Sequence, residues 1–253
     1  MTETAVYRWL LAGWLALAPA VFVLLLRVTA PYGRHGRRGW GPAVPAAAGW
    51  VLMELPAPLL FAFFWWAGGA PLRMPQLLFL ALWELHYLHR ALVYPLLRIG
   101  RGRPMPLSIP LLAIVFNVVN AYLNGRYLFG IGPAYPAGWL RDPRCLAGAA
   151  LFFAGWAVNL HSDAILRRLR RPGETGYRIP RGGLFRFVSC PNYLGEIVEW
   201  IGWALMTWSP PGLAFALWTI ANLAPRALAH HRWYRATFPD YPRERRALVP
   251  FVL

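Results

Sequence analysis

Long runs of apolar residues alternate along the whole chain with short polar segments that carry arginine. A helix needs about 20 residues to cross a hydrocarbon core of about 30 Å, and five of the runs reach that length. The last two runs are shorter and are separated by Ser209-Pro210-Pro211-Gly212, which predicts a tight helical hairpin. The pattern therefore predicts an all-α polytopic membrane protein with seven transmembrane helices, at residues 9–28, 44–66, 75–97, 107–129, 146–166, 194–208 and 213–229.

No internal repeat or low-complexity linker divides the chain, so we expect a single membrane domain over residues 1–253. Residues 1–8 contain both Glu3 and Arg8, and no small-residue cleavage site follows the first apolar run. We therefore expect this run to be a retained span and not a cleaved signal peptide.

Composition and charge agree with a membrane protein. The 253 residues are 58% hydrophobic, which is high for a soluble domain. The formal net charge is +16, and every basic residue is an arginine. Most arginines follow the first, third, fifth and seventh spans, so the positive-inside rule places the N-terminus outside and the C-terminus in the cytoplasm. Topology thus accounts for the basic charge, and we expect no nucleic-acid partner. Exclusive use of arginine indicates a bacterial inner-membrane protein; in a eukaryote, the same topology would indicate the endoplasmic reticulum.

Other site types find little support. Cys145 and Cys190 fall at opposite ends of the predicted bundle, which predicts two free thiols. The histidines are too few and too scattered for a membrane di-iron cluster, so we expect no metal. A G-x-G-x-x-G fingerprint is absent, which excludes a Rossmann domain.

Polar stripes mark the cytoplasmic ends of three predicted helices. Each stripe follows helical spacing and so lies on one helix face: Asn159, Asp163, Leu166 and Arg170; Asn192, Glu196 and Glu199; Arg226, His230 and Tyr234. Such stripes either hold helices together through hydrogen bonds or line a shared pocket. In a pocket, arginines suit phosphates, while amides and carboxylates suit ribose hydroxyls and amide groups.

Two further polar residues, Glu54 and Tyr87, fall deep inside predicted spans. A carboxyl group there is protonated, paired or directed into a cavity, whereas a buried tyrosine is commonly a packed aromatic residue. If both face one apolar cavity, they provide two donors for a carbonyl oxygen.

Several motifs occur together in the order of a known family. They include Glu54-Leu55-Pro56, His86-Tyr87-x-His89-Arg90, Asn159-x-His161-Ser162-Asp163, Tyr177-Arg178-Ile179-Pro180-x-Gly182-Gly183 and Asn192-x-Leu194-Gly195-Glu196. With these motifs, the chain resembles the membrane steroid 5α-reductases (3-oxo-5α-steroid 4-dehydrogenases), and we expect a bacterial member. The resemblance implies a seven-helix fold that binds NADPH in a cytoplasm-facing pocket. The implied cofactor contacts are Tyr32, Arg103, Asn159, Asp163, Arg170, Tyr177, Arg178, Asn192, Glu196, Arg226, His230 and Tyr234.

The resemblance also implies the chemistry. Residues that match Glu54 and Tyr87 hold the 3-keto oxygen of a 3-oxo-Δ4 steroid, such as testosterone or progesterone, while hydride from NADPH goes to C5. We expect the steroid to enter from the bilayer and the protein to be a monomer. Met53 replaces a glutamine that a family member carries, which bears on substrate preference.

The alternative functions are those of a related membrane enoyl or sterol reductase and of an isoprenylcysteine-type membrane methyltransferase, a family that is similar in the C-terminal half. A non-enzymatic scaffold would not need the polar stripes.

Overall fold

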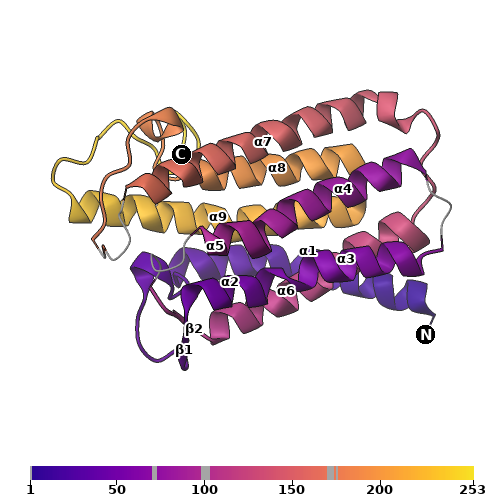
Figure 1. The fold of residues 1–253 in the computed structure, drawn as a ribbon, viewed down its shortest axis with the longest axis horizontal. Coiled ribbons are helices and arrows are strands. Elements are labelled where there is room, and N and C mark those ends of the chain that lie inside the picture. Colours follow the sequence, from indigo (N-terminus) through magenta and orange to yellow (C-terminus); the bar gives the residue numbers. More distant parts are fainter. Residues whose placement is uncertain (1, 70–72, 98–102, 170–173, 175) are drawn as a thin grey trace.

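The chain forms an elongated bundle of helices, and its two termini lie at opposite ends of the long axis (Figure 1). The computed structural model describes residues 2–69, 73–97, 103–169, 174 and 176–253. The helices are α1 (Glu3–Arg27), α2 (Ala46–Glu54), α3 (Pro56–Ala67), α4 (Met74–Leu88), α5 (Tyr94–Leu96), α6 (Ser108–Arg126), α7 (Pro143–Arg168), α8 (Pro191–Thr207) and α9 (Pro210–Thr237). A π-helical turn, His89–Val93, joins α4 to α5, and another, Tyr127–Ile131, extends α6. Two short strands, β1 (Ala43–Val44) and β2 (Met105–Pro106), pair antiparallel beside the entrance to α2.

All seven predicted ranges are helical, which confirms the helical fold class. Within the described residues, five helices are long and apolar enough to cross a membrane. They are Glu3–Arg27, Ala46–Ala67, Ser108–Ile131, Pro143–Arg168 and Pro210–Thr237. The other two predicted ranges correspond to α4 with its continuation into α5, and to α8, which has 17 residues. Both pack against candidate spans, α4 on α3, which is part of the span Ala46–Ala67, and α8 on α7 and α9.

The helix ends differ from the predicted ranges by one to eight residues, and two of the differences bear on the site. The range 44–66 is interrupted at Leu55, because Pro56 and Pro58 lack the N–H groups that would continue the hydrogen-bond ladder. This interruption directly follows Glu54. At the other end of the chain, α9 continues past residue 229 to Thr237 and carries His230 and Tyr234 in its last turns.

The predicted hairpin between the last two helices is present. α8 ends at Thr207, and Trp208 adopts the left-handed conformation with a φ of 43°. The Ser209 hydroxyl then accepts a hydrogen bond from the Gly212 N–H at 3.1 Å and caps α9.

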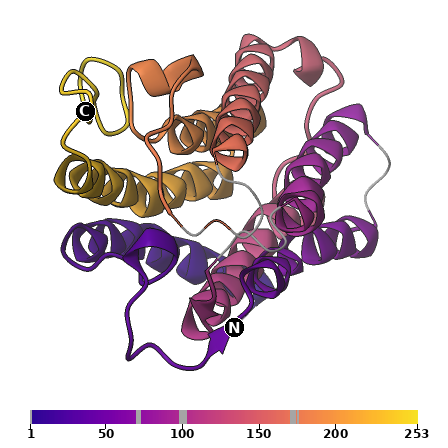
Figure 2. The same ribbon diagram turned by 60° about the vertical axis from the view of Figure 1, so that its left-hand side comes forward.

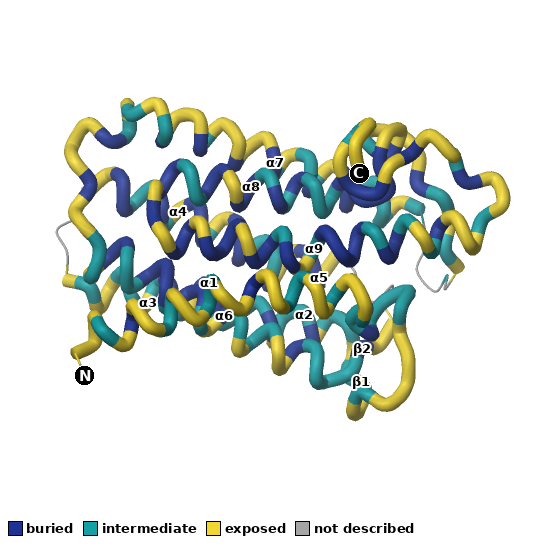
Figure 3. The backbone as a smooth tube through the Cα atoms, turned by 180° about the vertical axis from the view of Figure 1, so that it is seen from behind, coloured by how far each residue is buried: buried dark blue, intermediate teal, exposed yellow. Residues whose placement is uncertain are grey.

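Aromatic side chains form the centre of the bundle. Trp83, Trp200 and Trp203 are almost fully buried together with Phe61, and the Phe61 and Trp83 rings stack at 4.3 Å. Exposed residues instead lie along the outer faces of the bundle (Figure 3). They include large apolar side chains, among them Trp9, Trp66 and Leu112. Such extensive apolar exposure is unusual on a soluble protein and suits contact with lipid.

Glycines bring α7 and α8 unusually close together. A Cβ added to Gly195 of α8 would lie 2.6 Å from the backbone nitrogen of Asn159 in α7, and one added to Gly155 would collide with the backbone of Glu199. Gly148 and Gly202 repeat this arrangement further along the same pair. Small residues of this kind let helix backbones touch inside membranes. The contact places the polar ends of α7 and α8 directly side by side.

Candidate functional site

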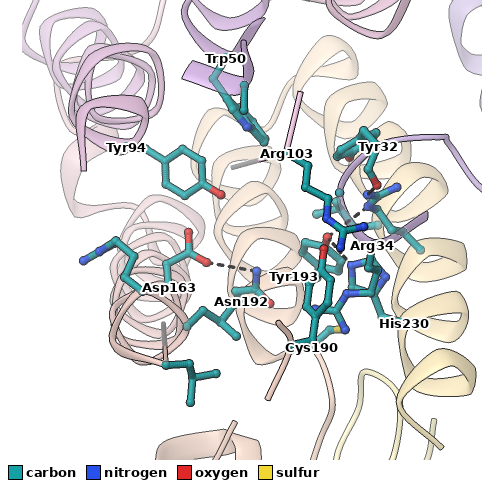
Figure 4. Close-up of a pocket in the computed structure, with 18 of the residues that line it drawn as sticks. Tyr32, Arg34, Trp50, Tyr94, Arg103, Asp163, Cys190, Asn192, Tyr193 and His230 are labelled. Atoms are coloured by element: carbon teal, nitrogen blue, oxygen red, sulfur yellow. Dashed lines mark hydrogen bonds between the residues drawn. The ribbon is translucent and has the colours of Figure 1, made fainter. Parts of the chain in front are cut away.

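A polar cavity of about 190 Å³ lies at the end of the bundle where α9 ends. Figure 4 shows Asp163 and Asn192 on one side of it and Arg34, Arg103 and Tyr32 on the other. Nine predicted cofactor residues line this cavity: Tyr32, Arg103, Asp163, Tyr177, Arg178, Asn192, Arg226, His230 and Tyr234. Glu196 lines a neighbouring cavity, Asn159 lies behind the wall, and Arg170 falls outside the described residues.

Arg226 of α9 fixes one wall of the polar cavity. Its guanidinium donates hydrogen bonds to the carbonyl oxygens of Ala30, at 3.2 Å, and Tyr32, at 3.1 Å. It also donates to the Tyr193 hydroxyl and lies 3.5 Å from the centre of the Tyr32 ring. Because these bonds involve backbone carbonyls, Arg226 holds the segment after α1 against α9 and keeps its positive charge beside the cavity.

Arg34 is a second cation in this wall, which the sequence analysis did not select. Its guanidinium lies over the rings of Tyr177, Trp233 and Tyr234 and donates to the Tyr234 hydroxyl at 3.2 Å. Its Nη1 is buried and has no hydrogen-bond partner within the described residues. A buried donor without an acceptor is uncommon, and a phosphate oxygen is a suitable acceptor for it. The signal for Arg34 was available, since it directly follows Tyr32-Gly33.

His230 contacts a second histidine, His35. The His35 Nε2 and His230 Nδ1 atoms are 2.9 Å apart, and the Tyr193 hydroxyl lies 3.3 Å from His230 Nε2. Burial, together with the charges of Arg226, Arg34 and Arg37, lowers the pKa of His35 to about 4. His35 is therefore neutral at pH 7, and the two rings share a single N–H between them.

The polar stripes on α7 and α8 have both of the roles considered for them. The Asn192 amide donates to the Asp163 carboxylate at 3.2 Å inside the polar cavity (Figure 4). The Asn159 amide instead donates to the Asn192 carbonyl at 3.0 Å and to Glu196 at 3.4 Å, and so links the two helices. Glu199 does not join either cavity; it faces α4, where its carboxylate lies 2.7 Å from His86 Nδ1.

An apolar cavity of about 560 Å³ adjoins the polar one. Trp14, Leu24, Phe116 and Trp218 contribute to its walls, and both Glu54 and Tyr87 lie at its border. Five residues line both cavities: Tyr32, Trp50, Arg90, Leu223 and Arg226. A ligand in one cavity can therefore contact a ligand in the other.

Asn117 of α6 connects the two predicted catalytic residues. The Tyr87 hydroxyl donates to the Asn117 Oδ1 at 3.4 Å, and the Asn117 Nδ2 donates to the Glu54 Oε2 at the same distance. The same Nδ2 donates to the Met53 carbonyl oxygen at 2.6 Å, which fixes the orientation of the amide. The structure thus brings Glu54 and Tyr87 to the same amide, at the border of one apolar cavity.

Arg90 lies among three carboxylates at the junction of the cavities. Its guanidinium is 3.4 Å from Glu196, 3.7 Å from Glu54 and 3.9 Å from Asp163, and it lies over the rings of Trp50 and Tyr94. These four charged side chains are at most 14% exposed. Burial of unbalanced charge is costly, and the guanidinium of Arg90 offsets part of the negative charge that these carboxyl groups would otherwise leave uncompensated. Arg90 lies one helical turn from Tyr87, and this spacing could have identified it.

Both cysteines are free, as their sequence positions predicted, and both are buried. Burial raises the pKa of the Cys190 thiol to about 12. Cys190 lines the polar cavity but is an uncharged thiol at physiological pH.

Comparisons with known proteins show which proteins the chain is similar to. Residues 103–253 match the family described as 3-oxo-5-alpha-steroid 4-dehydrogenase. The chain is 47% identical over 242 residues to 3-oxo-5-alpha-steroid 4-dehydrogenase 1 of Bos taurus, which covers 94% of the chain and 93% of that protein. It is 47% identical over 254 residues to 3-oxo-5-alpha-steroid 4-dehydrogenase 2 of Homo sapiens, covering 96% of each. A steroid 5-alpha-reductase of Arabidopsis thaliana is 40% identical over 258 residues, covering 100% of the chain and 98% of that protein.

Proposed function

The chain belongs to the 3-oxo-5-alpha-steroid 4-dehydrogenase family, and we propose that it uses NADPH to reduce the Δ4 double bond of a 3-oxo-Δ4 steroid to the 5α product. It is an enzyme, a membrane steroid 5α-reductase, whose reaction depends on a nicotinamide cofactor. The single observation that supports the residue assignment is the pair of adjoining cavities. One is lined by several arginines together with Asp163 and Asn192, and the other is apolar with Glu54 and Tyr87 at its border.

The residues of the polar cavity fit a dinucleotide phosphate. Arg34, Arg103 and Arg178 provide guanidinium groups for phosphates, and the Nη1 of Arg34, which has no partner among the described residues, is a donor of the required kind. We propose that Arg170 contributes to the same group. Asp163, Asn192 and Glu196 offer acceptors and an amide for ribose hydroxyls and the nicotinamide amide, while Asn159 holds Asn192 in place. Three guanidiniums exceed the need of one pyrophosphate, which favours NADPH and its additional phosphate over NADH.

The apolar cavity fits a steroid whose ketone is directed at Glu54 and Tyr87. Leu17, Val21 and Leu24 of α1 form one wall of it. Only 6% of the residues in the most apolar stretch of α1 are buried, so this helix lies between the cavity and the lipid-facing side of the bundle. We propose that the substrate enters from the bilayer beside α1.

The catalytic roles follow from where charge develops. NADPH, when bound, supplies the hydride that goes to C5 of the steroid, and the C3 oxygen then gains negative charge. The Tyr87 hydroxyl and a protonated Glu54 donate hydrogen bonds to this oxygen, and these bonds are strong in a water-poor cavity. Asn117 holds both groups in position before the substrate binds, and the Tyr87 hydroxyl then turns from Asn117 to the ketone. Water delivers the proton that C4 requires.

A steroid turnover assay tests the proposal. Purified enzyme incubated with testosterone or progesterone should form the 5α product with NADPH faster than with NADH. The Tyr87→Phe and Glu54→Gln variants should lose activity while they keep the fold and NADPH binding. Wild-type rates from both variants would refute these roles. Reduction of an enoyl or other sterol substrate without steroid turnover would support the related reductase, and binding of S-adenosylmethionine instead of NADPH would support the methyltransferase.

We further propose seven spans, an outside N-terminus, a cytoplasmic C-terminus and a monomer in a bacterial inner membrane, or in the endoplasmic reticulum of a eukaryote. Termini at opposite ends of the bundle fit an odd number of crossings (Figure 1). The polar cavity and most arginines share the end that carries the C-terminus, as the positive-inside rule requires. Labelling of single cysteines added at the two termini with a membrane-impermeant reagent tests the orientation.

A further inference from the structure

A third cavity, of about 460 Å³, lies in the cap formed by the loop before α8 and the C-terminal tail. The two segments lie together at one end of the bundle (Figure 2) and are joined by hydrogen bonds from Arg246 N to Phe187 O, 2.9 Å, and from Ser189 N to Arg246 O, 2.8 Å. Its lining is Arg181, Gly182, Arg186, Phe187, Pro242, Glu244, Arg245 and Phe251. Among the described residues, it shares no lining residue with the polar or the apolar cavity.

Arg245 is the unusual residue of this cap cavity. It is only 5% exposed, and its Nε and Nη1 atoms are buried without a hydrogen-bond partner in the described part of the chain. Its guanidinium lies 5.2 Å from the centre of the Tyr241 ring, which contributes a π face but accepts no conventional hydrogen bond. Glu244 lines the same cavity, yet no ion pair joins it to Arg245 among the described residues. A buried cation left in this way is costly unless a ligand supplies the acceptors.

The surroundings of Arg245 select the ligand. Arg181 and Arg186 add two exposed guanidiniums to the cavity, against the single carboxylate of Glu244, so the net charge is positive. Paired N–H donors of arginine match the oxygens of a phosphate. The exposed rings of Phe187 and Phe251 lie beside the cations with their centres 5.7 Å apart. We propose that the cap cavity binds a phosphate-bearing anion. The buried guanidinium of Arg245 contacts this anion inside the cavity, and the exposed Arg181 and Arg186 contact it at the rim.

Two sources can supply this chemistry, the headgroup of an anionic phospholipid and a soluble phosphate compound. The apolar tail end formed by Phe251, Val252 and Leu253 is exposed next to the cations. An arginine cluster beside exposed apolar side chains is a common arrangement at an anionic membrane surface. The proposal does not depend on the assignment of NADPH to the polar cavity, because the two cavities have separate linings.

Thermal unfolding of the full-length protein tests the proposal. The protein is placed in nanodiscs of phosphatidylcholine, which give the baseline. In one test inorganic phosphate is added, and in the other the nanodiscs also contain phosphatidylglycerol. Each test is compared with a sample that contains chloride at equal ionic strength. Binding to the folded state should raise the melting temperature by about 3 °C at saturation. A rise with phosphatidylglycerol identifies a lipid headgroup, and a rise with inorganic phosphate alone identifies a soluble ligand.

Variants connect the effect to Arg245. Arg245→Gln should weaken the binding of whichever ligand stabilises the wild type, phosphatidylglycerol or inorganic phosphate, by about 10- to 100-fold. Arg245→Lys should keep part of this binding. Arg243→Gln, which removes an exposed charge outside the cavity, should keep the whole shift. If Arg245→Gln fails to fold, Arg186→Gln at the rim should still reduce the shift. The proposal is wrong if neither arm stabilises the wild type beyond chloride, if Arg186→Gln and Arg245→Gln keep the shift, or if Arg245→Gln loses NADPH affinity in parallel.

Discussion

At the residue scale, the structure adds partners that the sequence could not supply. Glu54 was identifiable because it is a lone carboxyl group in an apolar run, and Tyr87 because it belongs to the motif His86-Tyr87-x-His89-Arg90. Asn117 also lies in an apolar run, but helical spacing does not reveal which helix it faces. The packing of α6 against α2 brings its amide to Glu54, and the Tyr87 hydroxyl reaches the same amide from α4. Asn117 is thus a positioning residue for the proposed donors.

Replacement of Asn117 by leucine tests this role. Leucine has a similar size but holds neither Tyr87 nor Glu54, so both donors lose their fixed orientation. We expect kcat to fall about tenfold or more with a smaller change in the KM for steroid, because misplacement acts mainly in the transition state. Steady-state kinetics with testosterone and a separate NADPH titration provide the measurement. Unchanged kcat in a folded Asn117→Leu enzyme would contradict the role.

Arg34 offers a prediction for the cofactor. Because its Nη1 has no acceptor among the described residues, Arg34→Gln should weaken NADPH binding by about tenfold and reduce its dependence on salt. At saturating NADPH, kcat should stay close to that of the wild type. Fluorescence titration of NADPH at two salt concentrations measures both effects, and Arg37→Gln, which lies outside the polar cavity, is the control. Equal losses in the two variants would show that the effect is not specific to Arg34.

The His35 pair makes stability depend on pH. The pKa of His35 is lowered from 6.5 to about 4 in the folded protein, so between these values the unfolded chain binds a proton that the folded protein does not. The stability that the neutral His35 contributes to the folded protein is complete above pH 6.5 and is lost as the pH falls toward 4. The loss should amount to about 1 kcal/mol, because the imidazole is only partly shielded from solvent. Melting temperatures of wild type and His35→Gln at pH 7, 6 and 5 should converge at low pH; parallel curves would exclude this titration.

At the scale of elements, hydropathy located helices in all seven predicted ranges but not the contacts between them. Apolar length follows directly from the thickness of the bilayer, so the helical ranges could be predicted. The interruption at Leu55 was also encoded, in Pro56 and Pro58, but the run of apolar residues concealed it. The glycines of α7 and α8 give no hydropathy signal at all, although they determine how closely Asn159 approaches Asn192. Alignment of the polar stripes therefore depended on packing that composition does not show.

Gly155 tests the α7–α8 contact. A Cβ at this position meets the backbone of α8, which cannot move aside as a flexible side chain can. Gly155→Ala should therefore lower the free energy of unfolding by about 2 kcal/mol and weaken NADPH binding through displacement of Asp163 from Asn192. Gly13→Ala is the matched control, since a Cβ at this helical glycine of α1 meets nothing within 4 Å and should be neutral or slightly stabilising. Similar melting temperatures for the two variants would show that the close approach is not required.

At the scale of the whole molecule, the bundle joins two sites that the sequence presented separately. Six helices contribute to the apolar cavity, and its border with the polar cavity is formed by residues far apart in the chain, Tyr32, Trp50, Arg90, Leu223 and Arg226. Arg90 is the charged group at that border that contacts carboxylates from both sides, Glu54 on one and Asp163 on the other. Its position predicts that cofactor and steroid binding are coupled through it.

Arg90→Lys tests this coupling, because lysine keeps the charge but cannot reach three carboxylates and stack on Trp50 and Tyr94 together. Occupation of one cavity by NADP⁺ should tighten the binding of a product steroid in the other by about 5-fold or more in the wild type, and reciprocity requires the same factor for NADP⁺. In Arg90→Lys this factor should approach one. The affinity of each ligand measured alone should change less than the coupling factor between the two ligands. Isothermal titrations of each ligand with and without the other measure the factor directly. A full coupling factor in a folded Arg90→Lys protein would mean that the two cavities communicate through the shared walls of Tyr32 and Trp50 instead of through charge.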